Sequence, residues 1–393
     1  MSADIHGFDD ITLIELSRRR SYKWRAYPDD VLPAFVAELD FRLAPPVAAA
    51  LREAADLGDC GYAWADPALA EATSDFAHRL WSWDFASFDV TPIPDVMSGV
   101  LEMLRIALRP GDGVVINTPA YPPFFSHIGE ARCRAVEAPL QRTEHGHALD
   151  LDALEGAFRA GARAYLMCNP HNPTGLVLTR EELLRVADLA ERYDVLVLSD
   201  EIHAPLVFAG AAHVPYLSVG ESAAKRGIAF VSASKAWNIP GLKCAQMIAV
   251  SDDMHALVGQ LNEDVVFRVG HLGVAASIAA YRDGGEWLDK LRSVLDRNRT
   301  LFGDMLSEWL PAARYAPPRA GYLAWVDCSA LDLGERPADA FLERGLVAFR
   351  EGTDFGAAGT GFVRATIGTS RALLREIVER MRAAVSLSDL RAR

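Results

Sequence analysis

The chain has 393 residues, half of them hydrophobic, which is enough for a large buried core and two or more domains. Its net charge of −13, from 40 basic and 53 acidic residues, argues against a nucleic-acid or anionic membrane partner. The longest nearly uncharged apolar stretch, residues 272–281, is far shorter than the roughly 20 residues that span a bilayer.

The N-terminus and the cysteines predict the compartment. Asp4, Asp9 and Asp10 stand where a signal peptide would have basic and apolar regions. The five cysteines are odd in number and show no C-x-x-C spacing, a pattern typical of reduced core thiols. We therefore expect a cytoplasmic protein with no membrane partner.

The middle of the chain alternates apolar runs with helical periodicity. Between two of the runs, Thr179 and Glu182 form a capping box ahead of an apolar helix face. Continuous apolar runs are typical of strands in a parallel sheet, and strands that alternate with helices predict an α/β fold. The predicted strands are residues 114–117, 164–168, 195–198, 228–231 and 247–250.

The pattern changes at about Gly284. A long helix is predicted over residues 287–310, followed by strands at 322–326 and 362–367 and by a helix after Ser370. The first ~45 residues look irregular, and we expect them to fold back onto this second unit. The predicted organisation is a large domain over residues 46–284 and a smaller α+β domain made of residues 1–45 and 285–393.

Polar side chains follow three of the predicted strands. Asn172 follows the second strand, Asp200 ends the third, and Lys235 follows the fourth. Because ligands gather at the carboxyl ends of such strands, we expect these three side chains to meet. Pyridoxal phosphate (PLP) requires this set. Lys235 would bind its aldehyde, Asp200 would keep its ring nitrogen protonated, and Asn172 would donate to its phenolate oxygen.

Further residues are candidates for holding this cofactor. His203 is expected near the phenolate oxygen, and Tyr121, in a proline-rich turn, is a rigid aromatic that would stack on the ring. A phosphate requires N–H groups at a helix start, hydroxyls and a cation. The predicted phosphate ligands are Ser98, Gly99 and Val100, which would open a helix over residues 100–108, together with Ser232, Ser234 and Lys243.

A metal site is the alternative for His203, because it stands two positions after Glu201. No second histidine lies at ligand spacing, so we expect no metal.

The ordered motifs resemble a known family. The strings NPHNPTG, DEIH and S-x-S-K, with a basic residue eight positions after the lysine, resemble fold-type-I PLP enzymes of the aminotransferase class I/II superfamily. More closely, Lys23-Trp24, residues 36–41, Gly61-Tyr62, residues 121–124 and SKAWN-x-PGLK resemble the MalY/PatB-type C–S lyases, the cystathionine β-lyase group. The resemblance covers about residues 20–370 and implies the PLP-dependent transferase fold of type I.

The resemblance also implies roles for single residues. Lys235 would be the cofactor lysine and Asp200 the partner of the ring nitrogen, while Asn172 and Tyr121 would contact the ring. Tyr62 would reach the phosphate of the neighbouring subunit's cofactor, which implies a homodimer with shared active sites.

Arg364 would bind the substrate α-carboxylate through two parallel hydrogen bonds. Two positions depart from the commoner aminotransferase pattern. His203 stands where most of those enzymes carry tyrosine, which favours the lyase branch, and Lys243 stands where many carry arginine.

Three functions remain open from the sequence. The first is a PLP-dependent β-elimination that converts cystathionine or related L-cysteine S-conjugates to a thiol, pyruvate and ammonia. The second is an aminotransferase acting on an L-amino acid and a 2-oxo acid, which would use the same residues although His203 would be unusual. The third is a regulatory protein that keeps the cofactor and acts by binding a partner; intact Lys235, Asp200 and Arg364 argue against lost catalysis.

Overall fold

The computed structural model describes residues 6–63 and 67–391, with side chains over residues 7–63 and 67–386. Asp4 therefore lies outside the described residues. The helices are α1 (His6–Asp9), α2 (Leu13–Ser17), α3 (Tyr22–Arg25), α4 (Pro45–Leu57), α5 (Pro67–Trp81), α6 (Val96–Ala107), α7 (Pro122–Glu130), α8 (Leu151–Arg159), α9 (Arg180–Tyr193), α10 (Glu221–Arg226), α11 (Asp252–Val258), α12 (Glu263–Phe267), α13 (His271–Asp283), α14 (Gly285–Trp309), α15 (Pro337–Gly345) and α16 (Arg371–Arg391).

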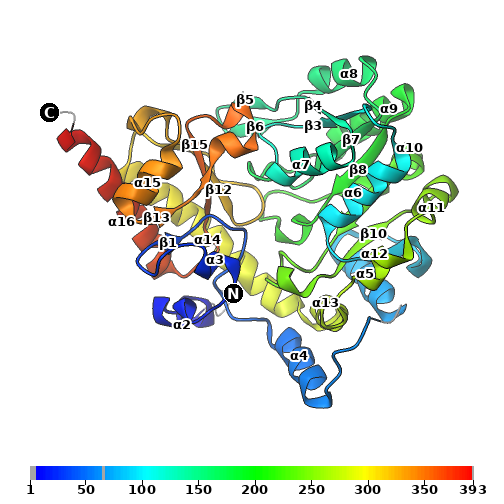
Figure 1. Ribbon diagram of the computed structural model, residues 1–393, viewed down its shortest axis with the longest axis horizontal. Helices are drawn as coiled ribbons and strands as arrows, with labels where there is room; N and C mark the ends of the chain where they lie inside the picture. Colours follow the sequence, from blue (N-terminus) through cyan, green and yellow to red (C-terminus); the bar gives the residue numbers. More distant parts are fainter. Residues whose placement is uncertain (1–5, 64–66, 392–393) are drawn as a thin grey trace.

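A seven-stranded sheet forms the centre of the larger part of the molecule (Figure 1). Its order is β2-β10-β9-β8-β7-β3-β4, and β10 alone runs against its neighbours. The strands are β2 (Val90–Ile93), β3 (Gly113–Ile116), β4 (Arg134–Glu137), β7 (Ala164–Cys168), β8 (Leu196–Asp200), β9 (Gly227–Val231) and β10 (Ala245–Ile248). The mostly parallel sheet predicted from the sequence is confirmed.

Helices cover both faces of this sheet. Along β7, Tyr165 and Met167 pack with residues of α8 and α9, whereas Leu166 and Cys168 pack with residues of α6 and α7. This alternation buries every position of β7 between the two layers, which explains its continuous apolar run in the sequence. Helix α9 begins with the predicted capping box of Thr179 and Glu182.

One strand differs from the prediction. The run expected at 247–250 forms β10 two residues earlier, and β10 pairs antiparallel with both β9 and β2. Residues 232–244 contain turns and one 3-10 helix, Pro240–Leu242, in place of a crossover α-helix. A parallel return normally uses such a crossover, so the chain comes back antiparallel.

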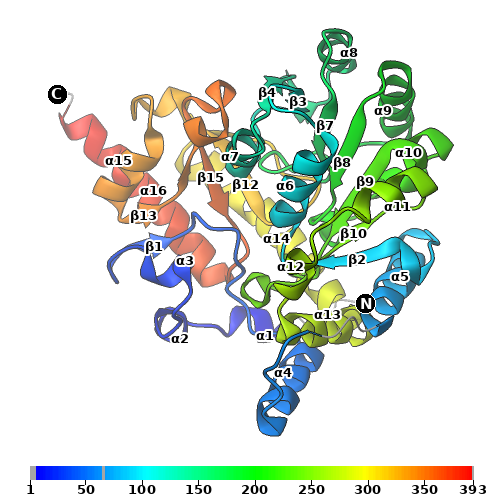
Figure 2. The same ribbon diagram turned by 45° about the vertical axis from the view of Figure 1, so that its right-hand side comes forward.

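A second sheet lies apart from the first (Figure 2). It has the order β11-β12-β15-β14 and is antiparallel throughout. The predicted strands 322–326 and 362–367 and the predicted helices 287–310 and after Ser370 appear here as β12, β15, α14 and α16. The remaining strands are β11 (Arg314–Tyr315), β12 (Leu323–Asp327), β14 (Arg350–Glu351), β15 (Phe362–Thr366), the β5–β6 hairpin (Gln141–Thr143, Gly146–Ala148), β1 (Leu32–Pro33) and β13 (Val347–Ala348).

The N-terminal segment packs on this second sheet and its helices. Strand β1 pairs in parallel with β13, and Phe8, Leu16 and Trp24 share one apolar core with residues of α14 and α16. Figure 2 shows α2, α3 and β1 beside α16, while α4 projects away from the rest. None of the helices in the described ranges has the length and hydropathy needed to cross a bilayer.

Candidate active site

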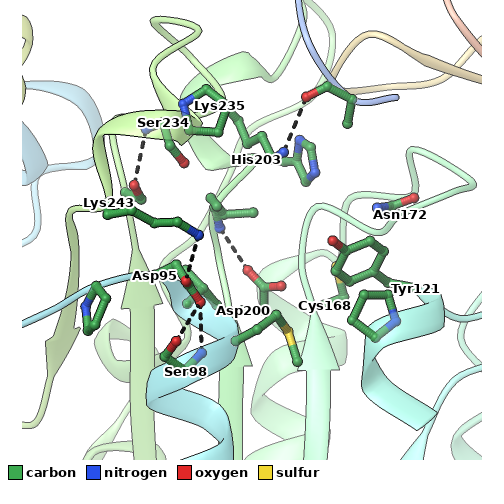
Figure 3. Close-up of a pocket in the computed structure, with 18 of the residues that line it drawn as sticks. Asp95, Ser98, Tyr121, Cys168, Asn172, Asp200, His203, Ser234, Lys235 and Lys243 are labelled. Atoms are coloured by element: carbon green, nitrogen blue, oxygen red, sulfur yellow. Dashed lines mark hydrogen bonds and ion pairs between the residues drawn. The ribbon is translucent and has the colours of Figure 1, made fainter. Parts of the chain in front are cut away.

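A cavity of about 390 Å³ opens at the carboxyl ends of β7, β8 and β9 (Figure 3). Asn172, Asp200 and Lys235 all line it, so the meeting of the three strand ends is confirmed. Other predicted site residues on its wall are Ser98, Tyr121, His203, Ser232, Ser234 and Lys243. Gly99, Val100, Tyr62 and Arg364 are not on its wall.

Asp200 is a buried carboxylate at the end of β8, where one oxygen accepts a hydrogen bond from the Ile202 N–H at 3.1 Å. Burial raises its pKa to about 7, although this hydrogen bond and Lys235 oppose the shift. Glu201 points to the other side of the strand, where it contacts His213 at 2.8 Å. The cavity therefore contains a carboxylate that favours a cationic partner.

Lys235 lies in the turn after β9. Its Nζ donates a hydrogen bond to the Ala37 carbonyl at 3.2 Å. Burial lowers the pKa of this amine to about 8, and the charge of Arg364 adds to the shift. A lowered pKa makes the neutral form of this amine more accessible than that of an ordinary lysine, which suits a nucleophile and a base.

Arg364, on β15, lies beyond the cavity wall. Its guanidinium donates to Asn172 Oδ1 at 3.1 Å and to the Phe35 carbonyl at 2.9 Å, and its Nε has no partner among the described residues. Its Cζ lies 5.2 Å from the centroid of the Phe355 ring. Arg364 thus joins the second sheet to the Asn172 loop and to the N-terminal segment.

His203 is buried on the cavity wall beside Lys235 (Figure 3). Burial lowers its pKa to about 3, with Lys235 and Arg364 as further causes, so the ring is neutral at physiological pH. Its Nδ1 has no hydrogen-bond partner within the described part of the chain. His203 can therefore accept or donate one further hydrogen bond inside the site.

The helix at the other end of the cavity starts earlier than predicted. Helix α6 begins at Val96, because the Asp95 carboxylate caps it by accepting from the Ser98 N–H at 2.8 Å. The expected start at Val100 is wrong, and the N–H of Gly99 already bonds the Asp95 carbonyl. A Cβ on Gly99 would lie 2.4 Å from the Ile93 side chain, so this glycine allows α6 to pack on the sheet.

Asp95 is a cavity residue that the sequence reasoning missed, although an aspartate before an apolar helix is a capping signal. Lys243 Nζ lies 3.2 Å from its Oδ2, as the dashed line in Figure 3 shows. Burial raises the pKa of Asp95, but the Ser98 N–H and Lys243 outweigh this effect, so the net shift of the pKa is downward.

The Ser232 hydroxyl stabilises the turn after β9. It donates to the Cys244 carbonyl and accepts from the Ser234 N–H.

Two tyrosines, one predicted to serve the active site and one not, lie in different surroundings. Tyr62 is 86% exposed and lies away from the cavity of its own chain. Tyr322, which the sequence reasoning passed over, is fully buried and donates to the Ala37 carbonyl at 3.0 Å, the same oxygen that Lys235 contacts.

Comparison with known proteins identifies the family. The model of the aminotransferase class I and II family matches residues 38–381, and the chain belongs to this family. The cystathionine β-lyase of Corynebacterium glutamicum is 35% identical over 94% of this chain and 98% of its own length. A Mycobacterium leprae protein that carries the same name provisionally is 44% identical over 95% of this chain and 96% of its own length.

The fold agrees with this assignment. The crystal structure of cystalysin from Treponema denticola, which contains pyridoxal 5′-phosphate, superposes with a TM-score of 0.91 at 27% identity. The match covers 98% of this chain and 99% of cystalysin. The predicted family resemblance and the predicted fold class are thereby confirmed.

Proposed function

We propose that this chain catalyses β-elimination of cystathionine or related L-cysteine S-conjugates to a thiol, pyruvate and ammonia. It is a PLP-dependent carbon–sulfur lyase by its similarity to cystathionine β-lyases over nearly the whole chain. The observation that carries the proposal is the meeting of Lys235, Asp200 and Asn172 in one cavity.

The residues of the cavity fit PLP. Asp200 is a buried carboxylate suited to a protonated ring nitrogen, and Lys235 is a buried amine with a lowered pKa. His203 has an unpaired Nδ1 for a ring oxygen, and Tyr121 offers an aromatic face. The phosphate would lie at the start of α6, held by Ser98, Ser234 and Lys243, which line the cavity. Gly99 and Val100 are not on this wall, and the Ser232 hydroxyl already donates to the Cys244 carbonyl, so these three would support the phosphate site from behind.

When bound, PLP supplies an electron-accepting ring that acidifies the substrate Cα–H. Lys235 would take this proton as the general base, since it lines the cavity and its lowered pKa makes its neutral form accessible. Asp200 would hold the proton on the ring nitrogen by a charge-assisted hydrogen bond. The carbon–sulfur bond electrons would leave with the thiolate, which a proton converts to the thiol. Water would hydrolyse the released aminoacrylate to pyruvate and ammonia.

Arg364 would bind the substrate α-carboxylate. Its guanidinium already contacts two oxygens, those of Asn172 and Phe35, and a carboxylate offers the same kind of acceptor with a full charge. Binding of substrate would therefore exchange the Phe35 carbonyl for a stronger partner.

The proposal extends to assembly and organisation. An exposed Tyr62 is suited to reach the site of a second copy, so we propose a homodimer with shared active sites in the cytoplasm. Residues 46–284 would form the cofactor-binding domain, and residues 1–45 with 285–393 would form the smaller one.

The decisive experiment incubates PLP-loaded enzyme with L-cystathionine and no 2-oxo acid while pyruvate and free thiol are assayed. We expect stoichiometric release of both over many turnovers, and none from Lys235→Ala. Activity that appears only after a 2-oxo acid is added would instead make the protein an aminotransferase.

A further inference from the structure

The antiparallel sheet has one face packed on helices, and its other face carries Arg364, which contacts the cavity residue Asn172. Along β15, Val363 and Ala365 belong to the core shared with α14 and α16. Phe362 packs instead with Trp325 and Phe355 in a separate cluster on the opposite face. Because side chains alternate along a strand, Arg364 lies on the face of Phe362.

A second arginine stands beside Arg364 on this face. Arg350 of β14 pairs directly with Arg364 of β15. Residues opposite each other in an antiparallel pair project to the same side, with Cβ atoms about 5 Å apart. The charge of Arg350 also reaches the cavity wall: burial raises the pKa of Tyr121, and Arg364 and Arg350 both oppose that shift.

Arg350 has a carboxylate partner of its own. Its Nε lies 2.7 Å from Oδ2 of Asp354, and the two side chains are 42% and 34% exposed. An ion pair with this exposure adds little stability, so either group can exchange its partner for a ligand at low cost. Arg364, in contrast, is 5% exposed and is held by Asn172 and Phe35.

We propose that Arg350 and Asp354 form a second substrate subsite, which binds the far end of an S-conjugate that terminates in an amino-acid zwitterion. Arg350 binds the distal carboxylate and Asp354 binds the distal ammonium. With the α-carboxylate at Arg364, a short S-substituent reaches the adjacent strand where this pair lies. The inference rests on the proposed β-lyase function and specifies its preferred class of substrate, to which cystathionine belongs.

The test measures the turnover of four conjugates by the holoenzyme: L-cystathionine, S-(2-carboxyethyl)-L-cysteine, S-(2-aminoethyl)-L-cysteine and S-propyl-L-cysteine. Pyruvate release gives kcat and KM for each. Arg350→Gln should lower kcat/KM for the two conjugates with a distal carboxylate by about tenfold or more, mainly through KM. S-propyl-L-cysteine should change less than about twofold, the spread expected without a charged contact.

Asp354→Asn should act on the two conjugates with a distal ammonium in the same way. Arg375→Gln is the matched control, because Arg375 forms a similarly exposed pair with Glu379 on α16 at 2.9 Å and is assigned no substrate contact. We expect it to leave all four substrates unchanged.

The outcomes distinguish a failure of the subsite from a failure of the β-lyase function. Equal losses on all four conjugates, or none on the charged ones, would overturn the subsite while leaving the β-lyase function intact. Failure of the wild-type enzyme to release pyruvate from any conjugate would overturn the proposed function, and the subsite with it.

Discussion

The buried carboxylate of Asp200 should make the cofactor-free enzyme less stable than its asparagine variant at neutral and alkaline pH. Burial raises the pKa of Asp200 from 3.8 to about 7. A group with a raised folded-state pKa contributes stability that is complete below the unfolded pKa. That stability is lost as the pH rises through the folded value. Asp200→Asn removes the ionisation and should abolish this loss.

The size of the effect follows from the shift. A shift of about three pKa units is worth about 4 kcal/mol at most, of which about 3 kcal/mol falls between pH 5 and pH 8. For 393 residues, an unfolding entropy of about 2.1 cal/mol/K per residue gives roughly 0.8 kcal/mol/K. The melting temperature of Asp200→Asn, relative to wild type, should therefore rise by about 4 °C from pH 5 to pH 8.

The assay is thermal unfolding of cofactor-free protein, followed by circular dichroism at both pH values. Asp95→Asn is the matched control, because it makes the same substitution in the same cavity at a carboxyl whose pKa is lowered. A lowered pKa contributes stability above the unfolded value, so this control should reduce the melting temperature at pH 8. Asparagine remains a good helix cap, so the control tests the charge.

A melting-temperature difference between Asp200→Asn and wild type that is the same at pH 5 and pH 8 would refute the reasoning. It would mean that Asp200 is solvated or paired in the cofactor-free enzyme. The expected gain in stability should come with a loss of turnover, since the variant has no negative charge to hold the ring nitrogen protonated.

Three further predictions concern single side chains. Lys235→Ala should purify without the visible absorbance of bound PLP and lose more than about 10⁴-fold in turnover; retained turnover would exclude Lys235 as the base. Arg364→Lys should lower kcat/KM for L-cystathionine by about a hundredfold, because lysine cannot make the two parallel hydrogen bonds; a loss below threefold would contradict its role. Lys23→Met should lower the free energy of unfolding in urea by about 3–5 kcal/mol, because it leaves the Asp40 carboxylate buried and unpaired; recovery in Lys23→Met/Asp40→Asn would identify that charge as the cause.

The sequence predicted the centre of the site because its geometry follows from the sheet. Asn172, Asp200 and Lys235 each follow a buried strand, and parallel strands end at the same edge. The five inner strands were predictable because they are buried on both faces, so their runs are continuously apolar. The edge strands β2 and β4, which are only partly buried, were not predicted.

The periphery of the site was less predictable because it depends on turns. The direction of β10 follows from a connection without a crossover helix, and the start of α6 follows from one capping carboxylate at Asp95. Apolar patterning reports burial, and it does not report which way a strand runs or which side chain caps a helix.

The N-terminal segment shows why main-chain contacts at an active site cannot be predicted from the residues that accept them. Its main-chain carbonyls accept hydrogen bonds from side chains far along the chain: Phe35 from Arg364, Val36 from Thr366, and Ala37 from Lys235 and Tyr322. A carbonyl is the same group in every residue, so nothing in residues 35–37 encodes these contacts. The donors carry the signal, and two of them, Lys235 and Arg364, are the groups proposed to bind PLP and the substrate carboxylate. The attachment of this segment to the site therefore depends on these donor side chains, and substitutions at Lys235 or Arg364 should loosen it as well as weaken binding.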